Sequence, residues 1–189
     1  MMTQAVPFTD VSRSKAKWYL SKFTNTYGSQ FGNIMADYAA LWQLIDHYDC
    51  KSVAEIGTWE GYASLFMWLH PNVERSVAVD ICCDFGDGYH QGLARENYGR
   101  YFRYTTPAQL VICNSNEWTA TKEFDLVFVD GAHSQEQATR DLETAKRAAK
   151  KIVCFHDWHN GNQGVDRMIE AAPDAFKLVD GTSVAFVEL

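Results

Sequence analysis

Hydrophobic and polar positions along the chain form alternating blocks with two different periods. Short apolar runs bounded by turn residues predict strands, and apolar positions three and four residues apart predict helices. The predicted strands are Ser52–Ile56, Arg75–Ile81, Leu110–Cys113, Asp125–Val129, Lys151–Phe155, Phe176–Val179 and Ser183–Val187. The predicted helices are residues 33–48, Tyr62–Leu69, a segment that a capping box at Ser134 and Gln137 opens, and Gly164–Ala172. Such alternation is typical of α/β proteins with a parallel sheet.

Two features refine this expected sheet. Lys151–Phe155 is continuously apolar after its first residue, which is the pattern of a strand buried on both faces. Asp180-Gly181 separates the last two apolar runs and is a strong hairpin signal. We therefore expect an α/β fold with a doubly wound, mostly parallel, Rossmann-like sheet and an antiparallel C-terminal hairpin strand. The 189 residues should form a single domain, with a core over residues 33–189 and an N-terminal arm or lid over residues 1–32.

Charge and composition narrow the class of partner. The net charge is −7 and there is no basic block, so nucleic acid is disfavoured as the main ligand and a small-molecule substrate is favoured. No run of about 18 apolar residues is present, so we expect no membrane span. The start of the chain lacks the layout of a signal peptide, and five cysteines, an odd number, predict reduced thiols in the cytoplasm. The sequence leaves the oligomeric state open, a homo-oligomer included.

Acids and imidazoles follow the last two strands of the parallel set. The fourth predicted strand is followed by Asp130, and His133 comes three residues later. The fifth is followed by His156 and Asp157. Because ligands of an open parallel sheet bind outside the carboxyl ends of its strands, we expect these four side chains to converge on one crevice. Such a cluster can act in catalysis or bind a metal ion, and it favours an enzyme.

The first strand, turn and helix indicate the class of ligand. The turn carries glycines at Gly57 and Gly61, and Asp80 at the tip of the second strand lies 23 residues after Gly57, where an acid can accept ribose hydroxyls. A dinucleotide fingerprint needs glycine where this chain has Trp59 and Tyr62. A nicotinamide-dependent oxidoreductase is therefore disfavoured, and the remaining pattern suits a nucleoside that carries no phosphate.

Four segments, in this order, extend the pattern beyond the first turn. They are Glu55–Gly61 (EIGTWEG), Val129–Ser134 (VDGAHS), His156–Trp158 (HDW) and Gly164–Val165. With them the chain resembles the class I S-adenosylmethionine-dependent methyltransferases, in particular a subgroup with these segments. The resemblance covers roughly residues 33–189.

The resemblance implies that S-adenosylmethionine is the cofactor and that the methyl acceptor is a small hydroxylated metabolite. By position, the cofactor contacts fall on the first turn, on the tip of the second strand and on the segments after the third and fourth strands. The implied cofactor-binding residues are Glu55, Gly57, Thr58, Gly61, Asp80, Asn114, Ser115 and Asp130. Many relatives carry an acid in place of Asn114, whose amide can still bond the adenine edge.

The resemblance also implies catalytic and metal-binding roles. Several small-molecule O-methyltransferases of this kind bind a divalent cation, which here would be magnesium or manganese held by Asp130, His156 and Asp157. Where those enzymes have an acidic pair, this chain has His156-Asp157, and an imidazole ligand shifts the preference away from magnesium. His133 is the implied general base, and Asp130, the first of the implied metal-binding acids, is the other implied catalytic residue.

Simpler interpretations accompany these roles. Glu55 and Asp80 could merely cap the ends of their strands, Asp130 could fix its loop, and His133 could only brace that loop. Trp59 and Trp118 could flank adenine or fill space. An inactive homologue that binds the cofactor and works through protein contacts is the alternative to an enzyme.

Overall fold

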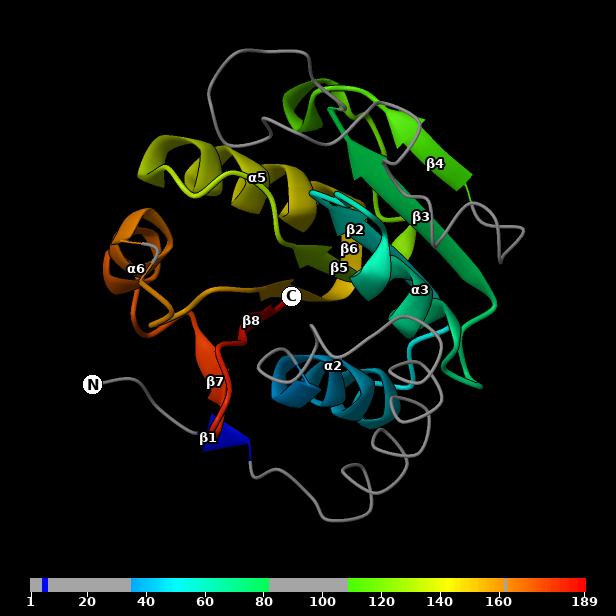
Figure 1. Ribbon diagram of the computed structural model, residues 1–189, viewed down its shortest axis with the longest axis horizontal. Helices are drawn as coiled ribbons and strands as arrows, with labels where there is room; N and C mark the ends of the chain where they lie inside the picture. Colours follow the sequence, from blue (N-terminus) through cyan, green and yellow to red (C-terminus); the bar gives the residue numbers. More distant parts are fainter. Residues whose placement is uncertain (1–4, 7–34, 82–108, 162) are drawn as a thin grey trace.

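The computed structural model describes residues 5–6, 35–81, 109–161 and 163–189. Eight strands form one sheet in the order β1-β7-β8-β6-β5-β2-β3-β4 (Figure 1). The strands are β1 (Ala5–Val6), β2 (Ser52–Ile56), β3 (Arg75–Asp80), β4 (Gln109–Ile112), β5 (Phe124–Val129), β6 (Ala149–Phe155), β7 (Lys177–Val179) and β8 (Ala185–Glu188). The helices are α2 (Met35–His47), α3 (Tyr62–Trp68), α5 (Gln135–Ala148) and α6 (Gln163–Glu170), with a 3-10 turn, η3 (Ser115–Glu117).

The sheet confirms the predicted fold class. Strands β6, β5, β2, β3 and β4 pair in parallel, and β8 pairs antiparallel with both β6 and β7. The hairpin that joins β7 to β8 turns through Gly181, which has a φ of 70°. Within the predicted arm, the two residues of β1 add a parallel strand beside β7, which sequence reasoning missed because so short a strand has no periodicity. The rest of the arm lies outside the described residues.

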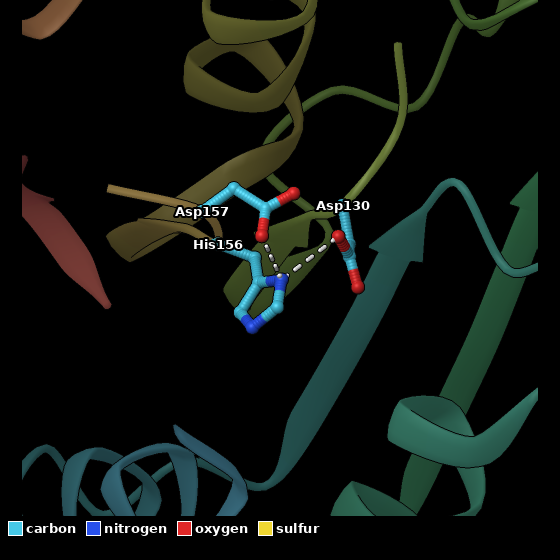
Figure 2. Close-up of side chains that lie close together, drawn as sticks. All are labelled: Asp130, His156 and Asp157. Atoms are coloured by element: carbon cyan, nitrogen blue, oxygen red, sulfur yellow. Dashed lines mark hydrogen bonds and ion pairs between the residues drawn. The ribbon is translucent and has the colours of Figure 1, made fainter. Parts of the chain in front are cut away.

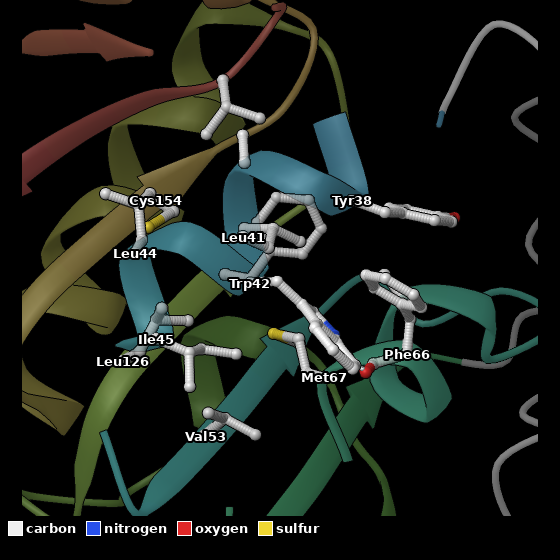
Figure 3. Close-up of a cluster of buried hydrophobic side chains, with 14 of the residues drawn as sticks. Tyr38, Leu41, Trp42, Leu44, Ile45, Val53, Phe66, Met67, Leu126 and Cys154 are labelled. Atoms are coloured by element: carbon white, nitrogen blue, oxygen red, sulfur yellow. Dashed lines mark hydrogen bonds between the residues drawn. The ribbon is translucent and has the colours of Figure 1, made fainter. Parts of the chain in front are cut away.

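Two apolar layers cover the two faces of the sheet. Successive residues of β5 alternate between them: Leu126 and Phe128 face α2 and α3, whereas Val127 and Val129 face α5 and α6. Alternation follows from the two-residue period of a strand, and both faces of β5 are buried. Figure 3 shows the first layer, where Trp42 of α2 stacks on Phe66 of α3 with ring centroids 5.0 Å apart. No helix among the described residues is long and apolar enough to cross a membrane.

The start of α5 departs in part from the sequence pattern. Ser134 caps the helix as predicted, because its hydroxyl accepts a hydrogen bond from the Gln137 amide at 3.2 Å. In a capping box the Gln137 side chain would reach back to the amide of Ser134. It instead donates to Asp141 at 2.9 Å, so the second half of the box is replaced by a contact one turn further along the helix.

Candidate functional site

The carboxyl ends of five neighbouring strands meet along one edge of the sheet. Gly57 follows β2, Asp80 ends β3, Asn114 follows β4, Asp130 follows β5 and His156 follows β6. Since β6, β5, β2, β3 and β4 are consecutive in the sheet, these five residues lie in one row although they are far apart in the sequence. The chain order reverses direction at β2, which is where a doubly wound sheet opens a crevice.

Gly57 lies at the junction of two halves of this edge, one at the ends of β2, β3 and β4 and the other at the ends of β5 and β6. It has a φ of +90°, which disfavours any residue with a side chain, and its amide donates to the Val79 carbonyl at 2.9 Å. A Cβ at this position would lie 2.3 Å from the Asp130 carbonyl oxygen and 2.4 Å from the Gly131 Cα. Only glycine allows the turn after β2 to pack this closely on the turn after β5.

A cavity of about 240 Å³ lies over β2, β3 and β5. Its wall includes five of the predicted cofactor-binding residues: Gly57, Asp80, Asn114, Ser115 and Asp130. The other three, Glu55, Thr58 and Gly61, are buried and do not line it. Trp59 is half exposed on the wall, whereas Trp118 is buried in the core beside Phe124. The structure thus separates the two tryptophans that the sequence left equivalent.

A hydrogen bond joins Asp80 to the backbone of Trp59, and both residues line the cavity. The Trp59 amide donates to the Asp80 carboxylate at 2.7 Å, and Trp59 has a φ of 45°. Thr58 turns inward and donates from its hydroxyl to the Val79 carbonyl at 3.3 Å. These contacts fix the Asp80 carboxylate at the tip of β3, where it can accept hydroxyl groups of a ligand.

Glu55, a predicted ligand contact, does not line the cavity in the described structure. Its side chain is buried and accepts hydrogen bonds from the Ser64 amide at 3.1 Å and from the Ser64 hydroxyl. Burial, with a smaller contribution from the charges of Asp130 and Asp80, raises the pKa of Glu55 well above its ordinary value. In the described structure this carboxyl holds the first turn of α3 against β2.

The second half of the edge is a cluster of carboxylates around one imidazole (Figure 2). His156 Nδ1 lies 3.1 Å from Asp130 Oδ1 and 3.2 Å from Asp157 Oδ1. His156 Nε2 lies 3.2 Å from Asp37 Oδ2. Burial alone would lower the pKa of His156, but the carboxylates outweigh it, Asp130 most strongly, and raise that pKa to about 12. The predicted convergence of Asp130, His156 and Asp157 is therefore observed.

His133 joins the cluster through Asp157. Its Nε2 lies 2.6 Å from Asp157 Oδ2, and Asn160 donates to the other oxygen of Asp157 at 2.8 Å. The bond to Asp157 raises the pKa of His133. Burial would raise the pKa of Asp157, but its bonds to His133 and His156 lower it well below its usual range. A small hollow lined by His133, His156 and Asp157 adjoins the cavity and shares Asp130 with it.

Close packing fixes the loop that carries His133. A Cβ on Gly164, in the first turn of α6, would lie 2.0 Å from the His133 carbonyl oxygen. The predicted Gly164–Val165 segment thus has a structural role, since it lets α6 press against the start of α5. Asp157 thus holds the imidazole of His133, and α6 packs on the backbone of the same residue.

Asp37 is a member of the cluster that sequence reasoning missed. It comes from the first turn of α2, and its second oxygen accepts a hydrogen bond from the Ser183 amide at 2.7 Å. In the sequence Asp37 is an acid in the first turn of a predicted helix, a common feature that does not by itself indicate a site. Its partners lie 119 and 146 residues away, so no local pattern could indicate this role.

Asp141 is the second missed residue. It lies on α5, is 2% exposed, and borders the cavity near Gly131. Ser115 and Gln137 donate to its Oδ1 at 2.5 and 2.9 Å. A signal was present in the sequence, because position 141 falls on the apolar stripe of the helix with Ala138 and Leu142. An acid on a buried helix face is unusual enough to mark a site.

Comparisons with known proteins place this geometry in a family. Residues 54–158, more than half of the chain, match a protein-family model described as a methyltransferase domain. The match spans the row of strand ends from β2 to β6. A search of curated protein sequences gave no significant match.

Solved structures of similar fold include several methyltransferases. An O-methyltransferase from Bacillus cereus in complex with SAH is 15% identical, with a TM-score of 0.52 over 96% of this chain and 92% of that one. The O-methyltransferase TomG from Streptomyces achromogenes, in complex with SAM, is 17% identical, with a TM-score of 0.54 over 96% and 90%. A SAH-bound methyltransferase from Podospora anserina is 13% identical, with a TM-score of 0.56 over 97% and 89%. At these identities the likeness shows a shared fold.

Proposed function

Because the chain belongs to the methyltransferase-domain family, we propose that it transfers the methyl group of S-adenosylmethionine to a hydroxyl oxygen of a small metabolite. The observation that carries this proposal is the charge of the cavity wall. Among the described residues the wall carries three carboxyl groups, Asp80, Asp130 and Asp141, and no basic side chain. A sulfonium and an ammonium group are favoured in such a site, whereas the pyrophosphate of a dinucleotide is repelled.

The proposed cofactor has two anchors in the described residues. Asp80 accepts the ribose hydroxyls, and the turn at Gly57 lets the cofactor backbone approach without a side-chain clash. Asn114 and Ser115 lie toward the adenine end. This arrangement directs the transferable methyl group to the side of the cavity that Asp130 shares with the hollow containing His133.

The proposed reaction is a direct displacement. The acceptor oxygen attacks the methyl carbon, the carbon–sulfur bond breaks, and S-adenosylhomocysteine leaves with the electron pair of that bond. The proton of the acceptor hydroxyl passes to His133, which Asp157 orients and whose positive charge Asp157 stabilises. Holding the two reactants in line can contribute about 7–11 kcal/mol to lowering the barrier. A positioned base typically adds about 10²–10⁴-fold.

The carboxylate and imidazole cluster also fits a divalent cation. Asp130, His156 and Asp157 each offer one donor atom, and these atoms all lie within 4.8 Å of one another. The His156 Nε2 contact with Asp37 is the outer hydrogen bond that usually orients a metal-binding histidine. A bound magnesium or manganese ion would lower the pKa of the acceptor hydroxyl. The same three carboxylates would also stabilise a protonated, metal-free His156. A chelator experiment distinguishes the metal-bound state from this metal-free state.

Calorimetry with S-adenosylhomocysteine and NAD tests the cofactor assignment. We expect S-adenosylhomocysteine to bind and NAD not to bind. Asp80→Ala should abolish binding, while Asp174→Ala, which removes an exposed acid before β7, should not change it. Binding of NAD in preference to S-adenosylhomocysteine would refute the proposal.

A methyl-transfer assay tests the reaction itself. Formation of S-adenosylhomocysteine is measured with panels of small alcohols, phenols, sugars and amines, each with and without a metal chelator. Turnover with a hydroxyl acceptor supports O-methylation, and its loss with chelator, restored by magnesium or manganese, supports the cation. Cofactor binding without turnover on any acceptor would favour a non-catalytic homologue.

A further inference from the structure

Asp141 is a buried acid in the cavity wall that the proposed reaction does not use. Its side chain projects from α5, and the residue is 2% exposed. No basic side chain among the described residues pairs with it. Burial raises the pKa of Asp141, and the hydrogen bonds from Ser115 and Gln137 only partly offset this. A buried carboxyl group that lacks a cation is costly, which calls for a compensating role.

The two oxygens of Asp141 have different surroundings. Oδ1 accepts from the Ser115 hydroxyl at 2.5 Å and from the Gln137 amide nitrogen at 2.9 Å. Oδ2 has no hydrogen bond from any residue in the described part of the chain. A Cβ on Gly131 would lie 3.4 Å from Oδ2, so the missing side chain leaves that oxygen open beside a residue that also lines the cavity.

The position of Asp141 matches the base end of the cavity. Asp80 is the proposed ribose contact, and Ser115, which bonds Asp141 directly, follows β4, a strand that β2 and β3 separate from β5 and the His133 loop. The position after β4 carries the amide of Asn114, whose oxygen already accepts from the Asn116 backbone at 2.9 Å. Within the described part of the wall, Asp141 Oδ2 thus offers an acceptor that no protein donor occupies.

We propose that Asp141 Oδ2 accepts a hydrogen bond from the exocyclic amino group of adenine and thereby selects a 6-amino purine over a 6-oxo purine. This inference rests on the proposed function. Ser115 and Gln137 both donate to Oδ1, which leaves Oδ2 as a pure acceptor. A 6-amino group presents a donor to that acceptor, whereas a 6-oxo group presents a second acceptor and is repelled.

Asp141→Asn reverses this preference by design. The donors on Ser115 and Gln137 hold the amide oxygen of the new side chain in the position of Oδ1. Its NH₂ group then occupies the position of Oδ2 and faces the ligand. The variant therefore offers a donor where the wild type offers an acceptor, with almost no change in volume.

Calorimetric titration of the full chain with S-adenosylhomocysteine and S-inosylhomocysteine tests the proposal. The wild type should bind the adenosyl compound about 10- to 100-fold more tightly, the range expected for one hydrogen bond to a charged group. Asp141→Asn should weaken binding of the adenosyl compound and strengthen binding of the inosyl compound, so that the ratio of the two affinities inverts. Ser115→Ala removes a donor to Oδ1 and leaves Oδ2 in place, and it should keep the sign of the wild-type preference.

The outcomes separate this inference from the proposed function. If Asp141→Asn lowers both affinities equally, Asp141 only braces the loop and the inference is wrong, while cofactor binding by the wild type still supports the proposed function. If the wild type binds neither compound, both proposals fall. Should Asp141→Asn not fold, Asp141→Ala serves instead, and the adenosyl preference should then disappear without inverting.

Discussion

The two halves of the strand-end edge hold their carboxyl groups in opposite ways. Beside β2 and β3, Glu55 and Asp80 accept hydrogen bonds from neutral donors, a serine and a backbone amide. Beside β5 and β6, Asp157 is flanked by two imidazoles. The pKa of Glu55 is raised and that of Asp157 is lowered, although both residues are buried. The sign of the shift is set by whether a cation lies within reach, rather than by burial alone.

This difference suits two different tasks. The half beside β2 and β3 holds its carboxyl groups with a serine and a backbone amide, and Asp80, the acid that lines the cavity there, can accept hydrogen bonds from a ligand. The half built from acids and imidazoles can accept a proton or hold a cation. Gly57 lies between them, because its turn after β2 packs directly on the backbone of Asp130 and Gly131. Substitutions in either half, or at this junction, test the comparison.

The largest effect is expected at the junction. Gly57→Ala places a Cβ 2.3 Å from the Asp130 carbonyl oxygen and should lower the free energy of unfolding by about 4 kcal/mol or more. Gly181→Ala is the matched control, since Gly181 also has a positive φ but nothing lies within 4 Å of its Cβ position. It should cost about 1 kcal/mol. Equal losses in urea unfolding of the two variants would contradict the role of Gly57 as a packing junction.

The next effect separates binding from turnover. Asp130→Ala should leave S-adenosylhomocysteine affinity nearly intact, because the proposed anchors of the cofactor, Asp80 and the turn at Gly57, lie in the other half. It should reduce the methyl-transfer rate by about 10³-fold, equivalent to roughly 4 kcal/mol of barrier. Calorimetry and the product assay on the same preparation check both parts. Loss of both properties, or of neither, would show that the two halves are not functionally distinct.

The third effect is a change in pH dependence. His133 must be neutral to accept a proton, and Asp157 raises its pKa, so the rate should climb as pH rises through a value above the ordinary 6.5. His133→Gln should lower the rate by about 10²–10⁴-fold and remove this rise. A pH–rate profile of both proteins measures it. An unchanged profile in the variant would assign the rise to another group.

The smallest effect is expected at Glu55. Its raised pKa means that, above its unfolded pKa, the folded state holds a proton that the unfolded state releases. Stability should therefore increase as pH falls from the folded pKa of Glu55 toward about 4.5, and decrease as pH rises over the same window. Glu55→Gln should flatten this slope and change stability at pH 7 by no more than about 1 kcal/mol. A steep loss of stability at all pH values would instead show that ionised Glu55 holds the fold together.

Much of the fold and part of the site could be predicted from local pattern. Apolar runs located the seven longer strands within one or two residues, and β5, whose six residues are all buried, fits best the rule that burial on both faces demands a continuous apolar run. Asp80, Asp130, His156 and Asp157 were predictable as site residues because they stand where strands end, and a parallel sheet brings all such ends to one edge. The two-residue β1 carried no such pattern.

The order of residues along the chain thus determined which strands form and which acids lie at their tips. It did not determine which groups touch. The bond between Glu55 and Ser64 was not indicated by the strand pattern, and neither was the contact of Asp37 with His156 or the place of Asp141 in the cavity wall. The reason is that strand positions follow from a period of two residues, while side-chain contacts follow from helix packing across more than a hundred residues. Only the packing of α2 and α5 on the sheet decided where those two acids point.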